Sequence, residues 1–102
     1  MPNDHRADAV APDVLEPAIK RRRNSMAGLW AAELLGLIGQ AAQDYARDVA
    51  HRHEQSPDDE PVANHLQAEL KGKVSLHEIR AKLAHLVHEA RRQLHHEQGG
   101  KS

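Results

Sequence analysis

The chain has no cysteine and no phenylalanine, and its only aromatic residues are one Trp and one Tyr. Without cysteine there can be no disulfides, thiolate zinc sites, iron–sulfur clusters or thiol nucleophiles. This composition also fits a reducing compartment such as the cytoplasm. So few aromatic rings exclude a stacking platform for single-stranded nucleic acid. The formal net charge of −1 does not favour general binding to nucleic acid or to an anionic membrane.

With 102 residues the chain has room for a single small domain. Apolar residues recur at helical spacing, and neither strand-like alternation nor a hairpin signal is present. We therefore predict an all-α fold, a small four-helix bundle over residues 13–96, with disordered tails at 1–12 and 97–102. The predicted helices span about 16–38, 40–53, 60–71 and 76–96.

Local signals set these boundaries. Pro17 suits the first position of a helix, where its missing N–H costs nothing, and Gly39 suits the end of that helix. Ser75 and Glu78 form a capping box before the last helix. The expected core follows the apolar stripes of the first and last helices: Met26, Leu29, Trp30, Leu34, Leu37, Ile79, Leu83 and Leu86.

A run of four cations precedes the apolar segment Met26–Gly39. That segment contains Glu33 and is shorter than the roughly 20 apolar residues that a membrane span needs, so we expect no span. The run is open to two interpretations: a surface for a partner, or a solvated first half of a helix. The candidate partner-contact residues are Lys20, Arg21, Arg22, Arg23 and Asn24.

Nine histidines invite a metal hypothesis. His85 and His88 are three residues apart, whereas zinc helices place two His four apart on one face, and no third ligand is fixed by spacing. We expect the histidines to be exposed. No nucleophile motif, phosphate loop or buried carboxylate pair is evident, so we predict no enzyme activity, no cofactor and no catalytic or metal-binding residue.

Arg22-Arg23-Asn24 followed by the segment Gly28–Gly36, GLWAAELLG, resembles the core signature of the bacterial ATP synthase inhibitor zeta subunit family. Two later stretches are similar to the same family: Ala41-x-x-x-Tyr45-Ala46-x-x-Val49, and Ser75-x-His77-Glu78-Ile79-Arg80-x-Lys82-Leu83 with Ala90-Arg91-x-Gln93. The resemblance covers about Arg21 to Leu94. It implies a four-helix regulator that docks on the catalytic head of ATP synthase and blocks ATP hydrolysis.

The first 20 residues depart from that family. Its members open with a charged helix containing Asp-Arg-Glu-Lys-Ala-Phe-like and Lys-Phe-Ala-like sequence, to which inhibition is attributed. Residues 1–20 of this chain contain three Pro and no Phe, so no inhibitory residue carries over and inhibition is expected to be weak or absent. The resemblance implies a protein partner and a cytoplasmic location, peripheral at the inner face of the membrane through ATP synthase, with a monomer when free. The alternative is a helical adaptor that binds another protein or nucleic acid through Lys20–Arg23.

Overall fold

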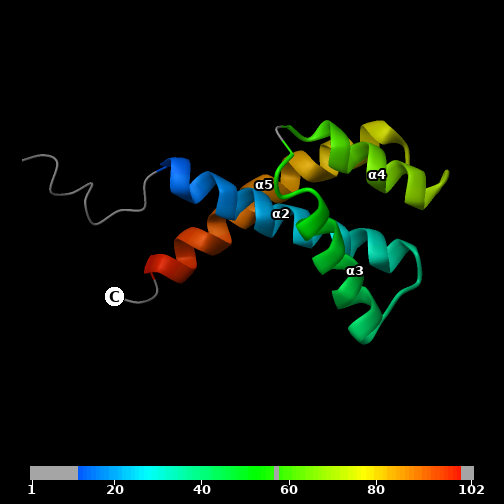
Figure 1. Cartoon of the computed structure of the whole chain (residues 1–102), viewed down its shortest axis with the longest axis horizontal. Helices are drawn as coiled ribbons and strands as arrows, with labels where there is room; N and C mark the ends of the chain where they lie inside the picture. Colours follow the sequence, from blue (N-terminus) through cyan, green and yellow to red (C-terminus); the bar gives the residue numbers. More distant parts are fainter. Residues whose placement is uncertain (1–11, 57, 100–102) are drawn as a thin grey trace, which may run out of the picture.

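The computed structural model describes residues 12–56 and 58–99, which form four helices joined by short connections (Figure 1). α2 spans Pro12–Leu34, α3 Gly39–Arg52, α4 Glu60–Leu70 and α5 Leu76–Gly99. α2 packs against each of the other three helices, and α4 also packs against α5. The all-α, four-helix fold predicted from the sequence is therefore confirmed.

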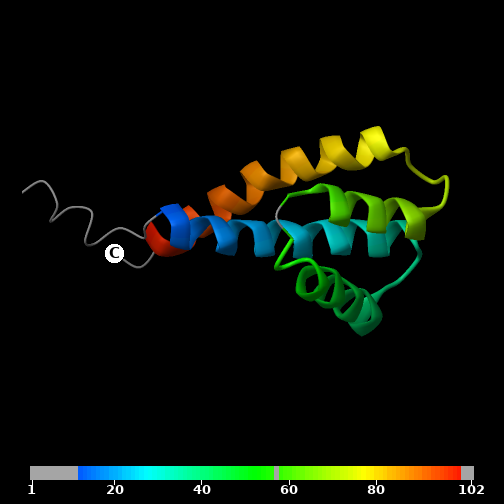
Figure 2. The same cartoon turned by 45° about the horizontal axis from the view of Figure 1, so that its top comes forward.

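The two long helices give the molecule its length (Figure 2). The start of α2 and the end of α5, blue and red, lie together at one end, while α4 lies between the two helices at the other and α3 covers another side of α2. The protein thus has a thick end built from four helices and a thin end built from two. The disorder expected for residues 1–11 and 100–102 lies outside the described residues.

α2 ends four residues earlier than the sequence predicted. Gly36 adopts a φ of +81°, its N–H bonds to the Glu33 carbonyl at 3.1 Å, and the Leu37 N–H bonds to the Ala32 carbonyl at 2.9 Å. These two bonds form a Schellman motif, which uses Gly36 because a left-handed residue without a Cβ satisfies the last carbonyls of the helix. Gly39, predicted to end α2, instead begins α3.

The start of α2 is also earlier than predicted, because the helix begins at Pro12 and carries Pro17 inside it. Pro12 stands at the first helical position, where a proline needs no N–H. Pro17 removes one bond, to the carbonyl of Asp13, in the second turn. Pro17 is exposed, so water can reach the carbonyl that loses its partner. The prolines therefore do not interrupt this part of the chain.

α2 contributes small residues to the core, which corrects part of the predicted set. Ala27 and Ala31 are fully buried against α3 and α4, whereas Leu29, on the opposite side of the helix, is 36% exposed. Leu37 lies beyond the end of α2 and is half-buried in the turn. Three predicted residues, Met26, Trp30 and Leu34, are partly buried and pack against the core. Three others on α5 are buried within it: Ile79, Leu83 and Leu86.

The predicted capping box of α5 is confirmed. The Glu78 N–H donates to Ser75 Oγ at 3.1 Å, and the Ser75 N–H donates to Glu78 Oε1 at 2.8 Å. At its other end α5 continues to Gly99, so the bundle extends past residue 96. A two-pronged ion pair between Arg22 and Glu97, at 2.8 and 3.0 Å, holds this last turn against α2.

Candidate functional site

Arg23 is the most buried member of the basic run. Its side chain is 1% exposed, and it donates to Asp59 at 2.8 Å and to the side chain of Asn24, also 1% exposed, at 2.8 Å. The hydrogen bond from Arg23 lowers the pKa of Asp59, against the opposing effect of partial burial. Arg23 and Asn24 are therefore buried in the free chain, where they fasten the α3–α4 connection to α2; their contact with a partner stays a prediction.

Lys20 and Arg22 also have partners within the chain. Lys20 Nζ donates to the Ser56 carbonyl at 2.9 Å, on the α3–α4 connection. Arg22 lies on another side of α2 and donates to Gln93 at 2.9 Å and to Glu97 on α5. The helix distributes the four cations around its axis, so they do not form one presented basic patch.

A groove of about 380 Å³ lies where α2, α3 and α5 meet. Three arginines rim it: Arg21 and Arg22 from α2, and Arg47 from α3. Arg21 is exposed, while Arg47 forms an ion pair with Asp44. The rest of the lining is mostly small or apolar: Ala18, Ser25, Ala50 and Leu94. A cationic rim over such a floor suits an amphipathic protein segment with acidic side chains.

Two histidines that were expected to be exposed lie against one another inside the fold. His53 is 8% exposed, and its Nε2 lies 2.7 Å from Nδ1 of His65, with the ring centroids 4.9 Å apart. Burial lowers the pKa of His53, and the neighbouring His65 lowers it further. The sequence did carry a signal, because His53 falls four residues after Val49 and so continues the buried stripe of α3.

The His65 ring lies near the Glu69 carboxylate, which also accepts a hydrogen bond from the Tyr45 hydroxyl. Its Nε2 lies 3.6 Å from Glu69 Oε1, and the Tyr45 hydroxyl donates to the same oxygen at 2.7 Å. Partial burial raises the pKa of Tyr45, and the hydrogen bond to Glu69 adds to that effect. Polar groups of α3 and α4 are thus joined in one chain of contacts, which links two helices that pack mainly on α2 and on α5, respectively.

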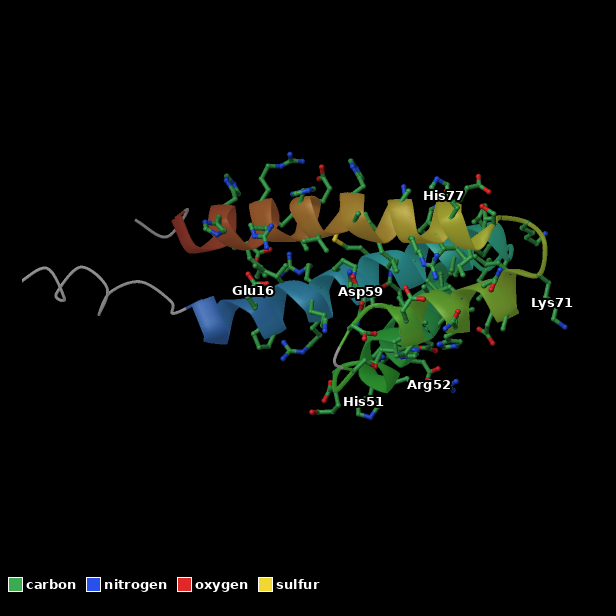
Figure 3. The ribbon with its side chains drawn as sticks, turned by 90° about the horizontal axis from the view of Figure 1, so that it is seen from above. Glu16, His51, Arg52, Asp59, Lys71 and His77 are labelled. Atoms are coloured by element: carbon green, nitrogen blue, oxygen red, sulfur yellow. The ribbon has the colours of Figure 1, made fainter. Side chains whose placement is uncertain are left out.

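The described residues contain no group of three or more His, Cys, Asp or Glu side chains arranged to hold a metal ion. His77, His88 and His95 are exposed along α5. Figure 3 shows His77 on the outer face of that helix, at the end of the molecule opposite Glu16. None of the helices in the described part of the chain has the length and hydropathy of a membrane span.

Comparison with known proteins gives one family. The family model described as ATPase inhibitor subunit zeta matches residues 13–93. No curated protein and no solved structure matches significantly. The matched range includes all of α3 and α4 and most of α2 and α5. It therefore contains every residue that lines the groove except Leu94.

Proposed function

The chain belongs to the family of the ATPase inhibitor subunit zeta, and from this premise we propose that it is a non-catalytic regulatory protein that docks on the catalytic head of ATP synthase. The observation that carries the proposal is the match over residues 13–93, which runs through all four helices. A family resemblance of this extent concerns the whole scaffold and not a single motif.

The groove between α2, α3 and α5 is the surface we assign to docking. It combines the exposed guanidinium of Arg21 with a largely apolar floor, and it opens beside the thin end of the molecule. Charges at the rim of an interface steer association and set orientation, while apolar area and shape hold the complex together. An acidic, amphipathic segment of the head is the partner that this chemistry fits.

We further propose that docking is accompanied by weak inhibition of ATP hydrolysis. The family resemblance attributes inhibition to a charged opening helix that bears Phe, and residues 1–20 of this chain have no Phe. An inhibitory element must bury apolar area between moving subunits, because each Å² of buried apolar surface contributes about 25 cal/mol of binding free energy. Inhibition is therefore expected to be weak because the segment lacks Phe, and not because its prolines break the helix, since α2 is helical through Pro17.

The adaptor alternative loses its basis in the contacts of the basic run. It requires Lys20–Arg23 to face a partner together, whereas Lys20, Arg22 and Arg23 each bond to other parts of the chain. We therefore do not retain it.

A binding measurement with matched charge reversals tests the docking surface. Immobilised catalytic head is titrated with the full chain, with Arg21→Glu and with Lys73→Glu, an exposed residue of the α4–α5 turn. We expect Arg21→Glu to weaken binding by about tenfold, equivalent to about 1.4 kcal/mol, and Lys73→Glu to bind as the unmodified chain does. Equal affinities for all three proteins would remove the groove from the interface, and no binding by any of them would refute docking on the head.

A further inference from the structure

We propose that His53 and His65 form a pH-sensitive clasp, which closes the α3–α4 connection near neutral pH and releases it on mild acidification. This inference concerns the stability of the fold and does not depend on docking. The two imidazole rings are in direct contact, with their centroids 4.9 Å apart.

The hydrogen bond itself limits the number of protons the pair can hold. At 2.7 Å between His53 Nε2 and His65 Nδ1, one nitrogen donates and the other accepts. A neutral pair, or a pair with one charge, meets this requirement. Two imidazolium rings do not, because each would then present N–H groups at both nitrogens and the charges would repel. The second proton therefore breaks the clasp.

The surroundings of His53 oppose its protonation. His53 is buried at the end of α3, and this burial lowers its pKa. The neighbouring His65 and the charge of Arg52 lower the pKa further, while Asp48 raises it. Ser56 Oγ lies 3.5 Å from the other ring nitrogen, Nδ1, at the limit of a hydrogen bond. The buried ring thus has little to compensate a positive charge.

Charged groups from the other helices complete this environment. On α4, Glu69 lies 3.6 Å from the outer nitrogen of His65, and the Tyr45 hydroxyl donates to the same carboxylate oxygen. From α2, Lys20 and Arg23 add cations against the connection, of which Arg23 is paired with Asp59. From α5, Arg80 pairs with Glu60 at the start of α4. A second proton on the pair would therefore charge the buried His53 ring, which burial and the nearby cations oppose.

Release of the clasp affects the segment between α3 and α4. His53 follows the last residue of α3, and His65 lies in the middle of α4, so their contact fixes the two helices relative to each other. The remaining ties between the connection and α2 are the Lys20 bond to Ser56 and the Arg23 bond to Asp59. Without the histidine contact, α4 keeps its packing on α5 and the Tyr45–Glu69 hydrogen bond to α3, but it loses its tie to the end of α3 that leads into the connection.

Unfolding by urea between pH 8 and pH 5 tests the proposal. Below about pH 6.5 the unfolded chain binds more protons than the native clasp. The unfolding constant should therefore rise as the pH falls, by up to tenfold per pH unit for each proton that only the unfolded chain takes up. The double variant His53→Gln, His65→Asn replaces each ring by an amide near the bonded nitrogen. It should show a flatter dependence on pH.

His51→Gln is the matched control, because His51 is on the same helix and its side chain is 82% exposed. In Figure 3, His51 and its neighbour Arg52 lie along the lower edge of the molecule, on the side away from α5. We expect this variant to retain the pH dependence of the unmodified chain. Parallel curves for the double variant and the unmodified chain would overturn the proposal.

A measurement on the unmodified chain decides the question even where the double variant fails to fold. Nitrogen NMR of the imidazoles should show that the protonation of His53 and that of His65 are coupled to each other. Amide protection factors, corrected for intrinsic exchange, should fall more between pH 7 and pH 5 in α4 than in α5. Independent titration of the two rings, or equal loss of protection in both helices, would contradict the clasp.

Discussion

Gly28 on α2 lies close to the backbone of α3, and Gly28→Ala should destabilise the protein although alanine is the better helix former. A Cβ at this position would lie 2.7 Å from Ala46 Cα and 3.2 Å from Ala46 Cβ. Gly28 belongs to the segment that resembles the zeta family, so the substitution probes a feature of that scaffold. It also probes the groove, because α3 carries Arg47 and Ala50 into its lining.

The expected magnitude follows from two opposing effects. Carbon atoms in good contact are about 3.5–4.0 Å apart, so the two helices must separate by about 1 Å. Overpacking of this kind costs about 1–3 kcal/mol, and the clash is with backbone and not with a flexible side chain, which favours the upper part of that range. Replacing Gly by Ala within a helix gains about 1 kcal/mol. We therefore expect the free energy of unfolding to fall by about 1–2 kcal/mol.

Urea unfolding followed by circular dichroism measures this difference, and the sign of the change decides it. Ala81→Gly, at an exposed position on α5, is the control for helix propensity and should cost about 1 kcal/mol. A Gly28→Ala variant that is more stable than the unmodified chain by a similar amount would show that propensity dominates and that the close approach of α2 and α3 is not formed.

Three further predictions concern stability. Trp30→Ala should cost about 2–3 kcal/mol in a thermal melt, less than a fully buried Trp, because the ring is only partly buried against the core; an unchanged melting temperature would contradict this placement. Ser75→Ala should cost about 0.5–2 kcal/mol, and Glu78→Ala should be partly redundant with it, so additive losses in the double variant would argue against the capping box. Asp59 has a lowered pKa because Arg23 donates to it, so its stabilisation is present above about pH 4 and is lost as the pH falls through its native value; Asp59→Asn should flatten the acid limb of the stability curve, and an unchanged acid limb would refute this.

The fold was predictable because its helices are indicated by local sequence patterns. The apolar period of α5, the capping box at Ser75 and the turn residues before α4 each involve neighbours in the sequence. Helix ends were less predictable. Gly36 and Gly39 can both adopt the left-handed conformation that ends α2, and only the backbone hydrogen bonds of the turn show that Gly36 does so. Pro17 gave a similar error, because a proline in an exposed second turn is tolerated.

The candidate site was less predictable because its contacts join distant parts of the chain. Nothing near Arg23 in the sequence indicates that Asp59, 36 residues away, neutralises it. Burial of Leu29 was expected because large apolar residues usually form the core, whereas α2 buries alanines to bring α3 close. The histidine pair was missed because the residue type was weighed above the position: histidine is only intermediate in burial, whereas His53 continues the apolar stripe of α3.

The most direct test of the proposed function is a titration of purified catalytic head with the full chain, reading occupancy and ATP hydrolysis in the same sample. The head is held at a fixed concentration, and bound chain is quantified at each step. We expect occupancy to approach saturation while most of the hydrolysis persists. Absence of binding would contradict docking on the head, and loss of hydrolysis in proportion to occupancy would contradict weak inhibition.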